Sequence, residues 1–380
     1  MADDLGWKDV GFLGSTIYQT PNLDRLRRQG MLFTNAYAAA SNCAPSRATL
    51  MTGQYSPHHK IYTVASSERG RTETRRIIPT PNTDTLAPDF QTLGHLFQKQ
   101  GYVTGTFGKW HLGTEPTQQG FDVNVGGSRN GSPNRTYFSP YNLRYLENGP
   151  EGEYLTDRLT DEAIAFVEEH RQQPFLLYLP YHSVHTPIQA KEEVIANYRN
   201  QPGIRDEQHA TYAAMIEILD ANVGRLLEQL ESLGLMENTI VVFTSDNGGI
   251  HAISNQDPLR AGKGSYYEGG TRVPLLVRWD GKVEPNSTSD TPVMNIDFYP
   301  TFAEILKADK TALPMLEGES LLPLLLQNGT LTERPLFWHF PIYLQAYKMQ
   351  DAQSRDPIFR TRPGSTMRLG KWKLHEYFED

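Results

Sequence analysis

The sequence predicts an α/β fold in which a largely parallel sheet is covered by helices on both faces. Short apolar, β-rich runs alternate with segments whose apolar residues recur at helical spacing. The runs expected as strands are Tyr102–Phe107, Phe175–Tyr181, Thr239–Thr244 and Pro274–Trp279. The segments expected as helices are Asn22–Gln29, Thr92–Gln100, Leu155–His170, Glu207–Leu233 and Asp297–Leu306. Such alternation is typical of parallel strands joined by crossover helices, and ligands then bind beyond the carboxyl ends of the strands.

The length and the C-terminal pattern predict one large domain with a small appendage. A chain of 380 residues suits a large α/β domain that carries a subdomain. From about Leu321 the strand-like pieces become shorter, at Leu336–Phe340 and Met367–Tyr377. We therefore expect a catalytic domain over residues 1–320 and a C-terminal α+β subdomain over residues 321–380.

Composition excludes several classes of function. The formal net charge of −8, from 36 basic and 44 acidic residues, gives no reason to expect nucleic acid or an anionic membrane surface as partner. No apolar run approaches the ~20 residues that cross a bilayer, so we expect no membrane span. The single cysteine excludes an intramolecular disulfide and a thiolate metal cluster. The N-terminus lacks the basic start and apolar stretch of a secretory signal.

The segment around the single cysteine predicts an anion-binding helix terminus. Proline suits the first turn of a helix and glycine the position past its end, so Pro45 and Gly53 bracket a short helix with Cys43 just before it. Free N–H groups and the helix dipole favour an anion there, and Arg47 adds a cation. A lone cysteine is more often a small buried hydrophobe than a nucleophile, so this segment alone does not decide the function.

The residues from Cys43 to Arg47, Cys-Ala-Pro-Ser-Arg, followed by Thr52 and Gly53, resemble the signature of the type I, formylglycine-dependent sulfatases of the alkaline phosphatase superfamily. The resemblance implies an alkaline-phosphatase-like fold and hydrolysis of sulfate monoesters at sulfur. It also implies that a formylglycine-generating or equivalent maturation enzyme oxidises Cys43 to an aldehyde. One hydroxyl of the hydrated aldehyde attacks sulfur, forming a sulfo-enzyme intermediate, and the other, once deprotonated, expels sulfate.

Two acidic segments resemble the metal-binding segments of the same family. Asp3 and Asp4 lie near the start, and Asp246 and Asn247 follow the strongly apolar run expected as a strand. Taken alone, Asp-Asn-Gly-Gly is a common turn sequence. These four side chains form the hard oxygen set that suits Ca²⁺ and, less well, Mg²⁺, and the resemblance implies that the oxidised Cys43 also contacts the metal.

Two segments after expected strands resemble the sulfate-binding segments of the family. Alternation along an extended tip would send Lys109 and His111 to one side. The resemblance gives Lys109 a sulfate-binding role and His111 the role of the base that deprotonates the second hydroxyl. His185 is expected to bind sulfate, whereas His182 either reaches the sugar side of the substrate or caps the strand. Two histidines three residues apart also fit zinc, but the other candidate ligands are mainly oxygen.

The glycine-rich segment around Lys263 resembles a further sulfatase segment whose lysine contacts the ester. Lys263 lies between two glycines, which lets the backbone approach an anion closely. We expect Lys263, with His185, to stabilise or protonate the leaving oxygen. Glu268 and Arg272 are expected to form a structural ion pair rather than to contact substrate.

The ends of the chain differ from the family pattern. The family has an apolar strand directly before the paired aspartates, whereas here only Met1 and Ala2 precede them. A further C-terminal strand is also expected beyond Asp380, so the sequence reads as truncated at both ends. The resemblance implies a periplasmic or secreted protein.

Several alternatives stay open at this stage. A phosphonate monoester or phosphodiester hydrolase shares the cysteine signature, a sulfated-glycan-binding relative retains the pocket without the chemistry, and a thiol hydrolase would use Cys43 with a histidine. A sulfated carbohydrate substrate is suggested by two segments. The polar segment Ser56–Pro88, expected like Gly126–Pro140 to be a long surface loop, carries Arg69, Arg71, Arg75 and Arg76, and the aromatic segment Trp338–Tyr343 could receive a sugar ring. The alternative is that the arginines form a solvated basic face and that the aromatic residues belong to the core.

Overall fold

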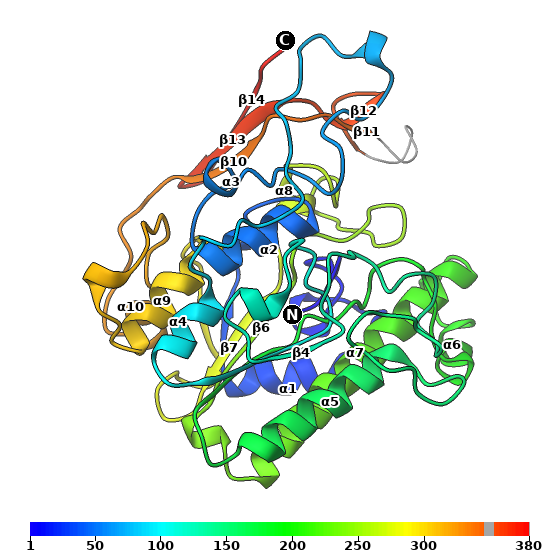
Figure 1. Ribbon diagram of the computed structural model, residues 1–380. Coiled ribbons are helices and arrows are strands. Elements are labelled where there is room, and N and C mark those ends of the chain that lie inside the picture. The colour runs from blue at the N-terminus through cyan, green and yellow to red at the C-terminus, as the bar shows by residue number, and fades with distance from the viewer. Residues whose placement is uncertain (346–352, 380) are drawn as a thin grey trace.

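The computed structural model describes residues 1–345 and 353–379, and its central sheet consists of two hydrogen-bonded parts (Figure 1). The first part is parallel, in the order β4 (Val123–Val125), β3 (Val103–Phe107) and β5 (Phe175–Tyr178). The second part has the order β6 (Ile240–Thr244), β7 (Leu275–Trp279), β1 (Met31–Phe33) and β8 (Ser287–Ser289). β7 runs antiparallel to both its neighbours, so this part is mixed, while β1 and β8 are parallel.

The first three residues lie between the carboxyl ends of β5 and β6. The N–H of Ala2 donates to O of Thr244, the last residue of β6, at 2.8 Å, and the N–H of Asp3 donates to Ser183 O, beyond β5, at 2.8 Å. Tyr181 also donates to Met1 O at 3.0 Å. This bonding places Asp3, and Asp4 after it, at the edge of the sheet where ligands of open α/β folds bind.

Helices cover both faces of the sheet, as the sequence predicts. The helices α1 (Pro21–Gln29), α5 (Leu155–His170) and α7 (Glu207–Ser232) lie on one side, and α2 (Cys43–Thr52), α4 (Leu93–Lys99) and α9 (Phe298–Ile305) on the other (Figure 1). Alternate strand residues enter the two cores: Leu32 and Leu276 pack with the first set, whereas Met31, Phe33 and Val277 pack with the second. Every expected helix and strand of this domain occurs, and the largest shift is at β5, which ends at Tyr178 rather than Tyr181.

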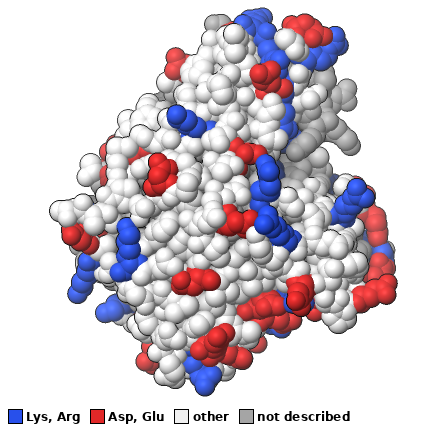
Figure 2. Space-filling view, viewed as in Figure 1, with Lys and Arg blue, Asp and Glu red and all other residues white. Residues whose placement is uncertain are grey.

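Shorter elements fill the connections. They are α3 (Ser56–His59), α6 (Glu192–Tyr198), α8 (Glu268–Thr271) and α10 (Leu322–Leu325), with β2 (Ala36–Tyr37) pairing in parallel with β9 (Val293–Met294). Within the described residues, the helices are too short or too polar to cross a membrane. On the face drawn in Figure 2, basic and acidic side chains are interspersed, which agrees with the small charge imbalance.

The C-terminal part forms a small antiparallel sheet, in the order β10 (Leu336–Phe340), β13 (Gly364–Leu369) and β14 (Trp372–Tyr377), beside a pair formed by β11 (Leu344–Gln345) and β12 (Phe359–Thr361). The strand-like piece expected over Met367–Tyr377 is divided between two strands, β13 and β14. The chain turns at Gly370 and Lys371, so that Leu369 pairs with Trp372, and Gly370 takes the left-handed conformation that this turn requires (φ 54°). The boundary at residue 320 remains a prediction, and residues 346–352 and 380 of that subdomain lie outside the described part.

The aromatic segment Trp338–Tyr343 belongs to the core, so its expected role as a sugar platform is wrong. Trp338 and Phe340 are 1% and 0% exposed. The indole N–H of Trp338 donates to Ala38 O at 2.8 Å, and the ring of Phe340 stacks on Tyr266 with centroids 3.8 Å apart. Alternation along β10 turns these large rings toward the domain beneath the small sheet.

The arginines of the loop Ser56–Pro88 bond mainly to their own surroundings. Arg69 donates to Val64 O, Arg71 pairs with Glu73, Arg75 pairs with Glu68, and Arg76 donates to Glu379 O. These bonds brace the loop and fasten it to the C-terminal strands. They favour the structural alternative over a role in substrate binding.

Candidate active site

Cys43 begins helix α2 at the floor of the candidate site. Asn42 is extended, the helix starts at Cys43, and it ends at Gly53, which adopts a left-handed C-cap (φ 66°). The helix therefore begins two residues earlier than Pro45 suggests, because the first turn has no intrahelical partner for its N–H groups and proline is tolerated throughout it. Every residue of α2 is buried, and Cys43 is 1% exposed.

Four oxygen-bearing side chains meet beside Cys43, from the two segments that the sequence singles out. Oxygens of Asp3, Asp4 and Asp246 lie within 4.8 Å of one another. An oxygen of Asp3, Cys43 Sγ and a ring nitrogen of His185 also lie within 4.8 Å of one another. The N–H of Asp4 donates to Asp246 Oδ1 at 3.2 Å, and Asn247 Nδ2 donates to Asp4 Oδ1 at 2.8 Å. The two segments are thereby locked to each other.

This oxygen cluster fits a hard divalent cation. Asp3 Oδ1 and Asn247 Oδ1 are buried acceptors to which no group of the described residues donates a hydrogen bond. Buried polar atoms are rarely left unpaired, and a cation is the partner that two such oxygens share best. Burial, with Asp246 and Asp4 as further causes, raises the pKa of Asp3, whereas Lys109 opposes this rise. A bound cation would reverse the shift.

Three cations face the three carboxylates. Arg47 Nε and Nη2 both lie 2.9 Å from Asp246 Oδ2, and Arg47 Nη1 donates to Lys109 O at 2.7 Å. Lys109 Nζ lies 2.6 Å from Asp3 Oδ2. Lys263 Nζ lies 2.7 Å from Asp4 and 3.3 Å from Cys43 Sγ. Because these six charges balance, an added divalent cation leaves a net charge of about +2, which suits a sulfate or phosphate group.

Burial lowers the pKa of all three candidate histidines below the ordinary value of a histidine. Burial lowers the pKa of His185 to about 3, with Lys263 as a further cause. The pKa of His111 and that of His182 are lowered well below the ordinary value by burial and by Lys109 and Arg47. In all three cases burial and nearby positive charge act in the same direction and favour the neutral imidazole.

Three local geometries differ from the sequence-based expectation or add to it, at residues 108–111, at His182 and at His185. The segment from Gly108 to His111 is not an extended tip, because Gly108 and His111 have φ values of 117° and 63°. His182 is 2% exposed, and neither of its ring nitrogens has a hydrogen-bond partner in the described residues. His185 Nδ1 lies 2.7 Å from Thr186 O, so this nitrogen carries the proton and Nε2, 3.8 Å from Asp4 Oδ2, points into the site.

The expected structural ion pair between Glu268 and Arg272 is confirmed, with a separation of 3.8 Å. Arg272 also donates to Thr34 O, while Lys373 of β14 lies 2.9 Å from Glu268.

The environment of Cys43 disfavours the thiol hydrolase, because burial raises the pKa of its thiol to about 12 and the thiolate would be scarce near neutral pH.

Sequence reasoning missed Tyr137, whose buried hydroxyl contacts the backbone on which His182 and His185 lie. A tyrosine within a glycine- and asparagine-rich segment gives no pattern that distinguishes it from an ordinary core residue. It also missed Asp9, a buried carboxylate that accepts from Gly6 N–H, Tyr212 and Ser254 behind the acidic cluster.

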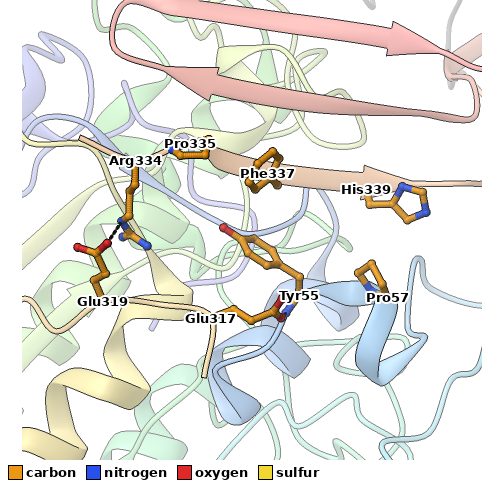
Figure 3. A pocket seen from close by; sticks show the side chains of 8 residues that line it. All are labelled: Tyr55, Pro57, Glu317, Glu319, Arg334, Pro335, Phe337 and His339. Atoms are coloured by element: carbon orange, nitrogen blue, oxygen red, sulfur yellow. Dashed lines mark hydrogen bonds and ion pairs between the residues drawn. The ribbon is translucent and has the colours of Figure 1, made fainter. Parts of the chain in front are cut away.

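A separate hollow lies between α3 and β10, away from these groups (Figure 3). Its volume is about 460 Å³, and its walls include Tyr55, Phe337 and His339. The ring of Tyr55 points toward Phe337, and Arg334 lies 3.8 Å from Glu319 at the rim. It contains none of the residues that the sequence singles out for catalysis.

Comparison with known proteins agrees with this pocket and fold. Residues 1–308 match the Sulfatase family, and residues 262–380 match the family described as N-sulphoglucosamine sulphohydrolase, C-terminal. A protein named Sulfatase from Formosa agariphila is 34% identical, over 92% of this chain and 76% of the relative. Human N-acetylgalactosamine-6-sulfatase is 32% identical, over 89% of this chain and 67% of the relative. The crystal structure of Ps i-CgsB in complex with k-i-k-neocarrahexaose superposes with a TM-score of 0.78 at 33% identity, covering 100% of this chain and 83% of that one.

The fold and the pocket define a hydrolase of the alkaline-phosphatase-like class, as the sequence predicts. The chain belongs to the sulfatase family, and the protein is a sulfuric ester hydrolase.

Proposed function

We propose that this sulfatase cleaves sulfate monoesters of a carbohydrate with a formylglycine made from Cys43 and with Ca²⁺ bound by Asp3, Asp4, Asp246 and Asn247. The observation that carries the proposal is the convergence, around Cys43 Sγ, of Lys263 Nζ at 3.3 Å and of a buried oxygen cluster with two unpaired acceptors. The hydrated aldehyde would supply one hydroxyl that attacks sulfur and a second whose deprotonation releases sulfate. Ca²⁺ would polarise the sulfate oxygens and favour ionisation of the attacking hydroxyl.

Other side chains around this centre orient the metal ligands, bind the sulfate oxygens or accept a proton. Arg47 holds Asp246 in place through two contacts to one oxygen and fixes the backbone of Lys109, so it orients the metal ligands and the helix together. Lys109 and His185 bind the sulfate oxygens. His111, whose pKa is lowered by burial and by neighbouring cations such as Lys109, accepts the proton of the second hydroxyl.

Lys263 and His185 act at the leaving oxygen. Lys263 provides a fixed charge next to the reacting centre, where it stabilises negative charge developing on the alcohol oxygen. The Nδ1–H of His185 donates to Thr186 O, so Nε2 faces the substrate. Binding of an anion raises the pKa of a neighbouring histidine, and the protonated Nε2 then donates to the leaving oxygen. His182 is buried, and burial lowers its pKa.

The names of the relatives support a sulfated carbohydrate as the substrate class. One relative is named for a sulfated N-acetylgalactosamine, and one similar structure holds a carbohydrate oligomer. We also propose that a maturation enzyme oxidises Cys43 and that the protein works in the periplasm or outside the cell, as the family resemblance implies.

The first experiment tests the chemistry. Mass spectrometry of the peptide that contains Cys43 should show loss of sulfur and a lower mass, together with reactivity toward a hydrazide probe. The matured protein should hydrolyse an aryl sulfate faster than an aryl phosphodiester, and Cys43→Ala should abolish turnover. A protein that keeps its thiol and yet hydrolyses aryl sulfate would contradict the formylglycine proposal. A preference for the phosphodiester would favour the phosphonate or phosphodiester hydrolase.

The second experiment tests the substrate. Sulfate release from a panel of sulfated sugars is compared with release from an aryl sulfate, using kcat/KM for each. A sugar hydrolysed with higher kcat/KM than the aryl sulfate supports the carbohydrate class. Equal or lower values for every sugar refute it. Binding of sulfated glycan by an active-site-intact protein without release of sulfate would instead support the binding relative.

A further inference from the structure

A buried tyrosine outside the proposed machinery is bonded to the turn that carries His185. Tyr137 is 0% exposed, and its hydroxyl oxygen lies 2.6 Å from His182 O and 2.8 Å from His185 O. Its single O–H proton is shared between these two carbonyls. The hydroxyl therefore joins the two ends of the turn 182–185.

The same turn also fixes the backbone of a metal ligand. The N–H of Asp3 donates to Ser183 O at 2.8 Å, and the N–H of Val184 donates to Asp3 O at 2.7 Å. A displacement of residues 182–185 would therefore move His185 and Asp3 together. In the proposed mechanism these two residues touch the substrate anion and the cation.

Tyr137 is itself anchored on all sides. Its N–H donates to Gln189 Oε1 at 3.0 Å, and its carbonyl accepts from Leu155 N–H, at the start of α5, at 2.8 Å. Its ring stacks on Tyr154 with centroids 5.6 Å apart and planes 20° apart. The hydroxyl is thus presented by a rigid element, which is what a support for an active-site residue requires.

We propose that Tyr137 is a positioning residue of this sulfatase, whose hydroxyl holds the turn 182–185 so that His185 and Asp3 stay aligned around the sulfate group. The inference rests on the proposed function, because it names the support of that same anion and metal site. The hydroxyl of Tyr137 bonds to the backbone of the turn, so its effect reaches the chemistry through the turn.

Tyr137→Phe removes the hydroxyl and keeps the stacked ring. Tyr141→Phe is the matched control, because Tyr141 is also buried and its hydroxyl also contacts two oxygens, Glu153 O at 3.0 Å and Glu153 Oε2 at 2.8 Å. Both variants lose a buried hydroxyl of the same kind, but Tyr141 does not contact the turn 182–185. A difference between them therefore reports on the turn and not on the general cost of losing a buried hydroxyl.

The test combines hydrogen exchange with kinetics on the matured full chain. In Tyr137→Phe, the amides of Val184 and Asp3 should exchange at least about tenfold faster than in the wild type. The kcat/KM for an aryl sulfate should fall by about ten- to a hundredfold, because small misplacements of reacting groups have effects of this size. The inhibition constant of inorganic sulfate should rise as kcat/KM falls. In Tyr141→Phe, all three quantities should stay within about twofold of the wild type.

Unchanged exchange at Val184 and Asp3 in Tyr137→Phe, or equal losses in both variants, would overturn the inference. If the wild type fails to hydrolyse sulfate esters, the proposed function fails, whereas the exchange comparison still decides whether Tyr137 holds the turn. Should Tyr137→Phe not fold, Gln189→Ala serves instead, because it removes the acceptor of the Tyr137 N–H. It should speed exchange at Val184, and no change there would refute the proposed support.

Discussion

Replacing Lys263 with alanine should separate the chemistry of the pocket from its stability. The ammonium of Lys263 lies 3.3 Å from Cys43 Sγ, the position where the reacting centre is proposed, and 9% of the residue is exposed. At 3.3 Å and an effective dielectric constant of about 20, a unit charge there interacts with the ammonium by about 5 kcal/mol. Asp4 offsets part of this, so we expect a net loss of roughly 3–4 kcal/mol, as for other preorganised donors, which lowers kcat/KM by about 10²- to 10³-fold.

The assay measures kcat/KM for an aryl sulfate, corrected for the fraction of Cys43 that is oxidised in each preparation. Lys373→Ala is the control, because Lys373 forms a similar buried ion pair with Glu268 at 2.9 Å. Removing one partner of a buried pair costs about 3–5 kcal/mol of folding free energy, so both variants should be destabilised. Only Lys263→Ala should lose turnover. A loss below about fivefold, or an equal loss in Lys373→Ala, would refute the reasoning.

Three further predictions concern stability. Removal of Ca²⁺ with a chelator should lower the unfolding temperature, because metal at about 1,000 times its Kd stabilises the folded state by about 4 kcal/mol. In Asn247→Ala, most of the difference in unfolding temperature between the metal-bound and the chelated protein should disappear. With Ca²⁺ bound, the urea midpoint should fall as the pH decreases below about 6.5. The folded state lowers the pKa of His111, His182 and His185, so the unfolded state binds more protons in this range. A urea midpoint that does not change with pH would contradict this prediction. Trp338→Phe should destabilise the fold by about 1–3 kcal/mol, because Ala38 O loses its donor, and a raised KM for a sulfated sugar would contradict its assignment to the core.

The sequence predicts the fold well wherever periodicity and caps agree. Helix α5 occupies Leu155–His170 as expected, because its apolar stripe and its ends are both visible in the sequence. The antiparallel direction of β7 is not visible, because a buried strand reads as a continuous apolar run in either direction. The hairpin at Gly370 was missed because a Gly-Lys pair is a weak turn signal between two runs that both alternate.

Lys109 and Asp246 could be predicted because each follows a strand and matches a family segment, whereas Asp3, Asp4, Arg47 and Lys263 could be predicted only from their match to a family segment. The structure places Asp3 and Asp246 in one cluster although they are 243 positions apart, which strand order alone does not reveal. The sugar platform failed for a different reason, because an aromatic run on a half-buried strand does not indicate which face its rings occupy. Tyr137 was missed because a hydroxyl that bonds backbone carbonyls leaves no trace in residue spacing.

If Cys43 is oxidised as proposed, its burial has a consequence for how the protein must be made. A maturation enzyme needs its target cysteine in an accessible peptide, whereas the finished fold exposes 1% of this residue. Lys263, which closes the pocket over the sulfur, is synthesised 220 residues later. At about 5–20 residues per second this delay lasts roughly ten to forty seconds, so the nascent chain offers a window for oxidation. A molecule that completes its fold before that window is used would remain inactive for its lifetime.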